Sequence, residues 1–488
     1  MVTSLSLPPF NYLLLNFLTF SLFFLFLVKK SNQQKNIKLF FLYGWLFGFG
    51  YFVSNLYWIS ISLTFDQNFK FLIPLTIILI PTFLALFYGL ISFLFIILKS
   101  KNIISSFLIF SLIFGILEFL RGSILTGFPW NLIAFSFSNQ LEILSIMSII
   151  GTYGFNLFCI SLFTCPAIFL LRNSRKDLGF CLFFLITIIF FYVQGFLKNE
   201  KFYNSDQNAH EYKIRVIGST ISLDRFYLSN ETASVIVDLI EISSPIKKEK
   251  TIFIWPEGIL PNISQNDLIK YKYLFKNKFN KNHFLMIGVN SETKVDDTTN
   301  YFNSFALYDN ELNLLNSYNK INLVPFGEFL PFENFLSNIG LKTVTNNFQS
   351  YTKGDRRNII EIKSDNYSLK ILPLICYEII YSGKLFDDNN FDFIINISED
   401  GWFGQSIGIK QHFTHSIFRA IESGKYVLRS ANNGTAAIIN PLGVIEQEVK
   451  FGTSGYIDFK ESRKIQPTIF SIYGNKIFAL LILLYIFL

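Results

Sequence analysis

The chain has 488 residues, of which 51% are hydrophobic, 18% aromatic and only 16% charged. This composition is too apolar for an ordinary soluble protein and predicts insertion into a membrane. The formal net charge of +7 comes partly from basic loops between apolar runs, and no base-reading motif occurs, so the charge does not indicate a nucleic-acid partner.

Six apolar runs in the first 200 residues are long enough to cross a membrane as helices. A helical span needs about 20 mostly apolar residues to cross a hydrocarbon layer of roughly 30 Å. We therefore expect a transmembrane helical domain over residues 1–200 and one C-terminal transmembrane helix over 467–488. Gly151, in the fifth run, predicts a kink. The spans are expected near 10–28, 38–60, 71–98, 103–120, 143–171, 178–197 and 468–488.

Basic residues indicate the orientation of these spans. Lysine and arginine concentrate in three loops, over residues 29–38, 99–101 and 172–176, which alternation places on one face of the membrane. By the positive-inside rule that face is cytoplasmic. The polar segment over residues 205–465 is therefore expected on the opposite, outer face.

The 205–465 segment mixes charged residues with short apolar runs, some of which show little alternation and suit strands buried on both faces. Helices must then cover the sheet, and amphipathic spacing predicts them over 230–242, 264–279 and 409–424. We expect an α/β layered domain that is large enough to bury its own core. The predicted strands are 213–218, 251–255, 284–289, 302–308, 369–375, 391–397, 426–430 and 435–440.

Cys376 is the solitary cysteine of this segment, because the other three cysteines fall in predicted spans. A lone cysteine in an exported domain has no internal disulfide partner, so its thiol is free. It follows an apolar run over 369–375, which places it at the end of a strand, where α/β folds bind ligands. An inert buried cysteine is the alternative.

Glu257 and Lys320 are candidates to act together with the Cys376 thiol. Glu257 also follows an apolar strand, between Pro256 and Gly258, and partial burial would suit it to act as a general base. Taken singly, each could be a solvated surface charge. Together with Cys376 they predict nucleophilic acyl transfer: the glutamate takes the thiol proton, and the ammonium and a backbone N–H stabilise the oxyanion. This chemistry needs no metal and no organic cofactor.

Histidine offers a rival mechanism. The segment contains His210, His283, His412 and His415, and the last two lie at i and i+3 on the predicted helix 409–424. Such a pair can ligate zinc, but no third or fourth ligand is evident. We therefore expect a pair on the helix surface and no metal site.

Several motifs occur in a fixed order along both halves of the chain. The membrane half contains Glu118-Phe119-Leu120-Arg121-Gly122 and Gly127-Phe128-Pro129-Trp130. The soluble half contains Trp255-Pro256-Glu257, the run 320–333, Cys376-Tyr377-Glu378, Asp400-Gly401-Trp402-Phe403-Gly404 and Leu428-Arg429-Ser430-Ala431-Asn432-Asn433-Gly434. In this order the motifs resemble the bacterial apolipoprotein N-acyltransferase family, whose soluble part belongs to the nitrilase superfamily. The resemblance implies a multi-spanning helical membrane bundle that carries an αββα sandwich.

The resemblance also implies a reaction. An acyl chain moves from a phospholipid, typically phosphatidylethanolamine, to the cysteine as a thioester, and then to the α-amino group of the diacylglyceryl-cysteine of an apolipoprotein. This is the last step of lipoprotein maturation, and it implies a bacterial inner membrane with the catalytic domain on the periplasmic face. By position, Glu257 is the base, Lys320 the oxyanion stabiliser and Cys376 the nucleophile.

The family also implies supporting roles. Glu328 would support the lysine, Tyr377 and Glu378 would shape the pocket and supply an oxyanion N–H, and Trp402 and Phe403 would line the path of the lipid. Asn303 and Arg429 are further candidates for substrate contact.

Two departures from the family pattern concern substrate contacts. The segment 218–223 lacks the usual family sequence, and Glu399 replaces a common Asn. A membrane-tethered amidase or nitrilase that hydrolyses a small amide with the same three residues is the alternative function. A receptor or transporter without enzymatic activity is a third, which predicts that Cys376→Ala leaves function intact.

Overall fold

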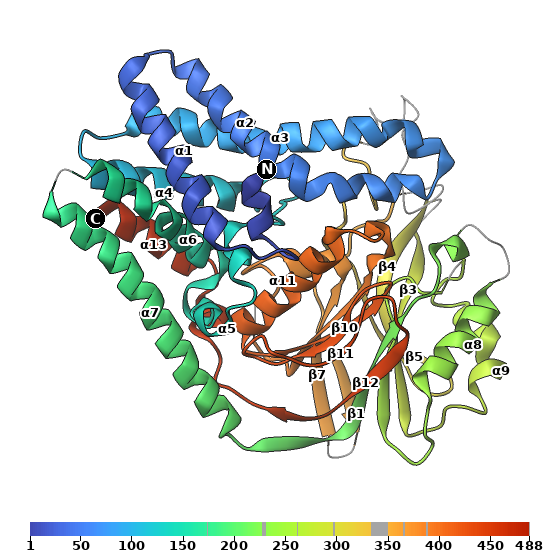
Figure 1. Cartoon of the computed structure of the whole chain (residues 1–488). Helices are drawn as coiled ribbons and strands as arrows, with labels where there is room; N and C mark the ends of the chain where they lie inside the picture. Colours follow the sequence, from blue (N-terminus) through green and yellow to red (C-terminus); the bar gives the residue numbers. More distant parts are fainter. Residues whose placement is uncertain are drawn as a thin grey trace.

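The chain folds into a helical bundle joined to a large sheet domain (Figure 1). The structure is a computed structural model that describes residues 1–172, 174–226, 231–260, 262–295, 298–332, 350–364, 367–386 and 389–487. Glu333, the last residue of the 320–333 motif, and Leu488 lie outside the described residues.

Within these ranges, six helices are long and apolar enough to cross a membrane. Each overlaps one of the predicted spans, and the prediction of a multi-pass membrane protein is confirmed. They are α1 (Leu14–Gln33), α2 (Ile37–Leu56), α3 (Ile73–Leu98), α4 (Ile103–Arg121), α6 (Met147–Leu171) and α7 (Arg175–Tyr203).

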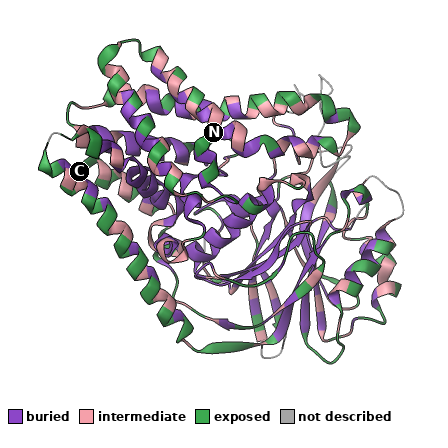
Figure 2. Ribbon diagram, in the orientation of Figure 1, coloured by how far each residue is buried: buried purple, intermediate pink, exposed green. Residues whose placement is uncertain are grey.

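The surface of the bundle is apolar, as expected for a surface in contact with lipid. Figure 2 shows exposed residues along α7, and the side chains there are large and hydrophobic. Soluble proteins rarely expose a contiguous patch of this kind. The exposed side chains on α7 include Leu182, Phe183, Ile186, Ile189 and Phe190.

The predicted kink in the fifth span is present. Gly151 has φ 67 inside α6, a left-handed conformation that glycine adopts at little cost. A Cβ at this position would lie 2.0 Å from the ring of Phe470. The kink therefore makes room for the C-terminal segment against the bundle.

That C-terminal segment differs from the expected single span. It forms two helices, α12 (Ile469–Tyr473) and α13 (Lys476–Phe487), separated by Gly474 at φ 56. With 12 residues, α13 is shorter than the roughly 20 residues that a membrane-crossing helix needs. It packs through Phe478 against Phe119 and Tyr153 of the bundle.

The sheet domain consists of two arms that meet at one seam. Among the described residues the sheet has twelve strands, of which nine follow the order β5-β4-β3-β2-β1-β9-β8-β7-β6 and three, β10, β11 and β12, pair off this path. The arms are joined where β1 meets β9, through the pairs Gly218 with Ala431 and Ser219 with Asn432. The strands are β1 (Gln207–Ser219), β2 (Thr251–Ile254), β3 (His283–Val295), β4 (Thr298–Tyr308), β5 (Leu314–Asn319), β6 (Ile360–Ser364), β7 (Tyr367–Ile375), β8 (Phe393–Glu399), β9 (Tyr426–Asn432), β10 (Ala436–Ile439), β11 (Ile445–Val449) and β12 (Gly455–Arg463).

Successive side chains of a strand enter different hydrophobic cores, which explains the layers of the sheet domain. In β2, Ile252 and Ile254 belong to the core between the arms, whereas Phe253 belongs to a second core beneath α8 (Thr232–Ser243). In β7, Ile371 faces the same central core, and its neighbour Leu372 faces the opposite side, where α11 (Ile407–Ser423) packs. Successive side chains of a strand point to opposite faces, so both faces of each arm are buried. The predicted αββα sandwich is confirmed.

One hydrophobic core runs from the bundle into the sheet domain. The cluster that contains Phe158 of α6 also contains Leu374 of β7 and Phe418 of α11. Figure 1 shows α11 lying between the bundle and the strands.

The helix expected over 264–279 is much shorter than predicted. Ser264 forms a bridge with Asn290 of β3, so helical structure begins only at Leu268, as a 3-10 turn followed by α9 (Lys272–Phe275). Strands β5, β6, β11 and β12 were not among the predicted elements. In β11 the first four residues are exposed, so no buried face marks the strand in the sequence.

Candidate active site

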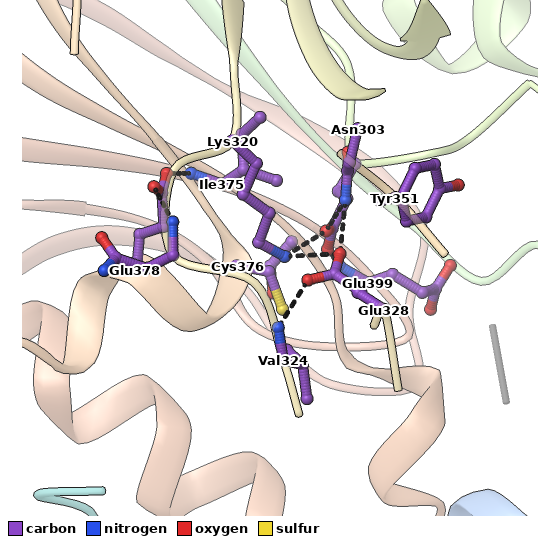
Figure 3. A network of polar contacts seen from close by, with 12 residues as sticks. Asn303, Lys320, Val324, Glu328, Tyr351, Ile375, Cys376, Glu378 and Glu399 are labelled. Atoms are coloured by element: carbon purple, nitrogen blue, oxygen red, sulfur yellow. Dashed lines mark hydrogen bonds and ion pairs between the residues drawn. The ribbon is translucent and has the colours of Figure 1, made fainter. Parts of the chain in front are cut away.

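Three strands deliver the predicted catalytic residues to one place (Figure 3). Glu257 follows β2, Lys320 follows β5 and Cys376 follows β7; Figure 3 labels Lys320 and Cys376. The strand β7 belongs to one arm of the sheet, and β2 and β5 belong to the other. The site therefore lies where the ends of both arms face each other.

Lys320 stands between two carboxylates. Its Nζ lies 3.1 Å from Glu257 Oε1 and 2.9 Å from Glu328 Oε1, and the side chain is 1% exposed. Burial alone would lower the pKa of this ammonium, but the two carboxylates raise the pKa well above its usual value. The structure thus keeps a fixed positive charge in a buried site, and it brings Glu328 to the lysine as the family resemblance implies.

Asn303 connects the same two carboxylates. Its Nδ2 donates to Glu257 Oε1 and to Glu328 Oε1, both at 2.8 Å. Its backbone carbonyl accepts from Lys320 N at 2.9 Å. Asn303 was expected as a candidate for substrate contact, and here it orders the charged groups around the lysine.

The second oxygen of Glu257 is held from the other arm of the sheet. The backbone N–H of Glu399, at the end of β8, donates to Glu257 Oε2 at 2.9 Å. Beneath the turn, Gly288 of β3 is so close that a Cβ there would lie 2.5 Å from Glu257 Cα. The carboxylate is fixed by tertiary contacts on both sides.

Cys376 lies at the turn from β7 into a short 3-10 helix. Its φ is 48, an uncommon left-handed value for a residue with a side chain, and the residue is 8% exposed. Burial raises the pKa of the thiol well above its usual value, Glu257 raises it further, and Lys320 opposes them. Figure 3 shows the sulfur on the same side as the Lys320 ammonium and the Glu328 carboxylate. The thiol is therefore buried, yet it faces charged groups.

Glu378 holds together the turns that carry the nucleophile and the lysine. It is fully buried, it accepts from Ile375 N at 2.9 Å, and it accepts from Ile321 N at 3.0 Å. Burial would raise its pKa, but Arg357, 3.0 Å away, lowers the pKa below its usual value. Glu378 was expected to shape the pocket, a role that stays a prediction; in the structure it is a buried carboxylate that both turns share.

Tyr377 connects the nucleophile turn to the bundle. Its hydroxyl donates to the Gly127 carbonyl at 3.0 Å, inside the membrane motif 127–130. Tyr381 donates to the carbonyl of Thr126 at 2.9 Å. Two tyrosines thus join the turn to the same membrane-proximal loop.

Trp402 and Phe403 lie at the junction with the bundle. The Phe403 ring centroid is 4.8 Å from that of Trp58, and the Trp402 centroid is 5.7 Å from that of Phe65. Both partners precede α3 in the membrane half. Trp402 and Phe403 thus contact the membrane half, and the expectation that they line a lipid path stays a prediction.

Arg429 is buried and makes its polar contacts away from the three catalytic candidates. Its Nη2 lies 2.9 Å from Asp400 Oδ2, and its Nη1 donates to the Thr435 carbonyl at 2.9 Å. It therefore stabilises Asp400 and the end of β9 within the described residues.

Two buried polar clusters were not expected from the sequence. Arg225 Nη2 lies 2.6 Å from Glu399 Oε2, with side chains 1% and 2% exposed. His412 and His415, expected on a helix surface, are both fully buried, so that prediction was wrong. The face of α11 that carries them packs against the bundle. Among the described residues, no group of three or more His, Cys, Asp or Glu could hold a metal ion.

Comparison with known proteins identifies the family. Residues 1–165 match the model of the apolipoprotein N-acyltransferase N-terminal domain, and residues 251–460 match the carbon-nitrogen hydrolase model. An apolipoprotein N-acyltransferase of Rickettsia prowazekii is 32% identical over 95% of this chain and 90% of its own length. The chain belongs to the apolipoprotein N-acyltransferase family.

A second relative agrees with this family. The apolipoprotein N-acyltransferase of Rhodopseudomonas palustris is 29% identical over 99% of this chain and 92% of its own length. Among solved structures, an amidase of the nitrilase superfamily from Nesterenkonia AN1 has a TM-score of 0.34 at 10% identity, covering 55% of this chain and 95% of that chain. The match to apolipoprotein N-acyltransferases spans both halves of the chain, which favours this family over a tethered amidase.

Proposed function

We propose that this chain transfers an acyl chain from a membrane phospholipid, through a thioester on Cys376, to the α-amino group of the diacylglyceryl-cysteine of an apolipoprotein. The observation that carries the proposal is the buried Lys320 ammonium between Glu257 and Glu328, beside the Cys376 thiol, at the junction with an apolar bundle. The relatives are apolipoprotein N-acyltransferases, which suggests the reaction, and the geometry offers residues for each step.

The first step makes the thioester. Because burial keeps Cys376 a thiol, a base must take its proton as the sulfur attacks, and Glu257 is the acceptor. The sulfur adds to the ester carbonyl of the phospholipid, and the oxyanion is stabilised by the Lys320 ammonium and a backbone N–H that follows the nucleophile. When the tetrahedral intermediate collapses, the C–O bond breaks and the lysophospholipid leaves with the proton from Glu257.

The second step releases the acyl chain to the amine. The α-amino group of the lipidated cysteine attacks the thioester carbonyl, and Glu257 accepts a proton from the nitrogen. The C–S bond then breaks, an amide forms, and the thiol of Cys376 is restored with that proton. Both steps pass through an oxyanion at the same place, so one fixed cation serves both.

The second carboxylate balances the charge of the lysine. Burying an ammonium without charged partners costs roughly several kcal/mol, because the ion loses its hydration. Glu328 compensates that penalty while Glu257 exchanges its proton, because Lys320 contacts both carboxylates. The cation therefore keeps a charged partner in each stage of the cycle.

Position at the membrane suits these substrates. The chain is a multi-pass membrane protein that modifies lipoproteins, and donor and acceptor both keep their acyl tails in the bilayer. An active site at the bundle junction gains proximity to those tails without transferring lipid into water. We propose a bacterial inner membrane, with the catalytic domain on the periplasmic face because the basic loops lie on the other side, and phosphatidylethanolamine as donor.

A direct experiment detects the covalent intermediate. The full chain in detergent micelles is mixed with acyl-labelled phosphatidylethanolamine, and label bound to protein is measured with and without hydroxylamine, which cleaves thioesters. We expect label on wild type but not on Cys376→Ala. The matched control is Cys159→Ala, which alters a buried cysteine of α6 and keeps the site intact. Hydrolysis of small amides without any acyl-thioester would instead support an amidase.

A further inference from the structure

The backbone of the nucleophile has a buried partner that the Glu-Lys-Cys chemistry does not use. His412 Nε2 lies 3.3 Å from the Cys376 carbonyl oxygen, and His412 Nδ1 lies 2.9 Å from Asp400 Oδ1. The His412 and Asp400 side chains are fully buried. Contacts at both ring nitrogens orient the imidazole, and in the tautomer that carries its proton on Nε2 the ring donates to the Cys376 carbonyl oxygen.

The contacted carbonyl controls the direction of a neighbouring N–H. The peptide unit that joins Cys376 to Tyr377 is planar and trans, so its C=O and N–H point in opposite directions. A side chain that fixes the carbonyl oxygen therefore also aims the Tyr377 N–H. This N–H follows the nucleophile directly, and it belongs to a turn whose φ of 48 at Cys376 the surroundings must maintain.

Asp400 contacts the imidazole of His412 at Nδ1, the ring nitrogen that does not face Cys376. Its carboxylate is held by Arg429 Nη2 at 2.9 Å and by the Ser398 hydroxyl at 2.8 Å. Although burial opposes its charge, Arg429 and His412 lower the pKa of Asp400 below its usual value, so it remains an acceptor. Arg429 Nη2 also lies 3.1 Å from His412 Nδ1, so Asp400 and Arg429 both face this nitrogen and leave the ring little freedom to turn.

The membrane half fixes the plane of the ring. Trp130, in the loop after α4, stacks on His412 with centroids 5.4 Å apart and planes 14° apart. The preceding residue on α11, Gln411, accepts from Trp130 Nε1 at 2.9 Å. Two consecutive residues of α11 thus bind the bundle and the nucleophile turn.

We propose that His412 is a positioning residue, which holds the Cys376–Tyr377 peptide plane so that the Tyr377 N–H faces the oxyanion. This inference rests on the proposed acyl transfer. It assigns to His412 the orientation of the backbone donor, whereas Lys320 supplies the charge. The Trp130 stack makes this orientation depend on contact with the bundle.

Two reactions of the same thiol separate this role from general packing. Acylation by acyl-labelled phosphatidylethanolamine forms an oxyanion, whereas alkylation by iodoacetamide substitutes at a saturated carbon and forms none. We expect His412→Phe, which keeps an aromatic ring but has no N–H, to slow acylation by about 10- to 100-fold, less than the roughly 10²- to 10³-fold cost of removing an oxyanion donor outright. Alkylation should stay within about twofold of wild type.

Two further variants complete the test. His412→Gln keeps a side-chain N–H that can reach the carbonyl, and it should restore most of the lost acylation rate. His415→Phe is the matched control, because His415 is also fully buried on α11 and packs on Trp130, yet its ring nitrogens have no hydrogen-bond partner among the described residues. It should acylate like wild type.

These measurements distinguish a failure of the positioning role of His412 from a failure of the proposed acyl transfer. If His412→Phe acylates at the wild-type rate, or slows alkylation as much as acylation, the positioning role is refuted. An equal loss in His415→Phe would refute it as well, because the effect would then belong to packing against Trp130. A wild-type chain that forms no acyl-thioester would instead defeat the proposed function itself.

Discussion

Arg225→Met tests whether the Arg225–Glu399 pair supports the site, and its effect can be worked from the contacts. The change removes a cation 2.6 Å from Glu399 Oε2 and leaves that carboxylate buried. Breaking a buried ion pair by removing one partner costs about 3–5 kcal/mol. Glu399 keeps donors from Gly401 N at 2.9 Å and Asn432 Nδ2 at 2.7 Å, so we expect a loss near the lower end of that range.

The double variant Arg225→Met/Glu399→Gln separates the effect of the Glu399 charge from the effect of the other contacts of Arg225. Arg225 also donates to the carbonyls of Ser222 at 2.9 Å and Ile259 at 3.2 Å, and Met cannot replace these bonds. Adding Glu399→Gln removes the unpaired charge, and it replaces one of the two acceptor oxygens with an NH2 group. We expect the double variant to be more stable than Arg225→Met alone by about 2 kcal/mol, within the range for interacting residues.

The loss of stability in Arg225→Met should increase as the pH rises. Burial raises the pKa of Glu399 above its usual value, against the effect of Arg225. A carboxyl group whose folded pKa is raised favours folding below its unfolded pKa, and this contribution is lost as pH rises through the folded pKa. Without Arg225 the folded pKa rises further, so the stability deficit of Arg225→Met should be smallest in acid, where only the bonds to the two carbonyls are missing, and largest at neutral pH and above.

The assay is thermal unfolding of the full chain in detergent, followed by near-ultraviolet circular dichroism at several pH values. The reasoning is refuted if the effects of the two single changes simply add in the double variant. It is refuted equally if the destabilisation of Arg225→Met does not change with pH. Glu399→Gln alone provides the fourth corner of the cycle.

Two further predictions concern the catalytic residues. Gly288→Ala places a Cβ 2.4 Å from the Pro256 carbonyl oxygen and 2.5 Å from Glu257 Cα, both backbone atoms, so the base must move and acylation should fall by roughly 10²-fold. Gly455→Ala is its control, because the nearest neighbour there is 4.0 Å away, and equal losses in both would contradict the argument. Because Glu257 raises the pKa of Cys376 and Lys320 lowers it, Glu257→Gln should shift the pH midpoint of iodoacetamide alkylation downward and Lys320→Met upward. Midpoints that do not move would contradict this electrostatic account.

Glu257 and Cys376 could be placed from sequence because each follows an apolar run that was predicted to be a buried strand. Lys320 follows β5, most of whose residues are exposed or half-buried, so no apolar run marked it, and its place came from its chemical fit with the other two and from the family resemblance. Polar side chains at strand ends collect at the edge of a sheet, so the sequence was sufficient to suggest that they meet. It was not sufficient to show that Asn303 and Glu378 order the charges around them.

The residues that were missed depend on contacts between distant segments. Arg225 and Glu399 are 174 positions apart, and each alone looks like an ordinary surface charge. His412 and His415 looked exposed because the sequence does not show that the bundle covers α11. Gly474 was the local signal for the broken C-terminal helix, but an isolated glycine is tolerated in an apolar helix and therefore carries little weight.

The hydrophobic core shared by α6, α11 and β7 has a consequence for how this enzyme can be divided. A water-soluble fragment that starts at β1 would expose the face of α11 on which Trp130 and Phe135 now pack, and it would lose the hydrogen bond from Tyr377 to the loop after α4. The membrane portion is thus an obligatory folding partner of the catalytic layer and more than an anchor. Chimeras that exchange either half between relatives must preserve both sides of that contact.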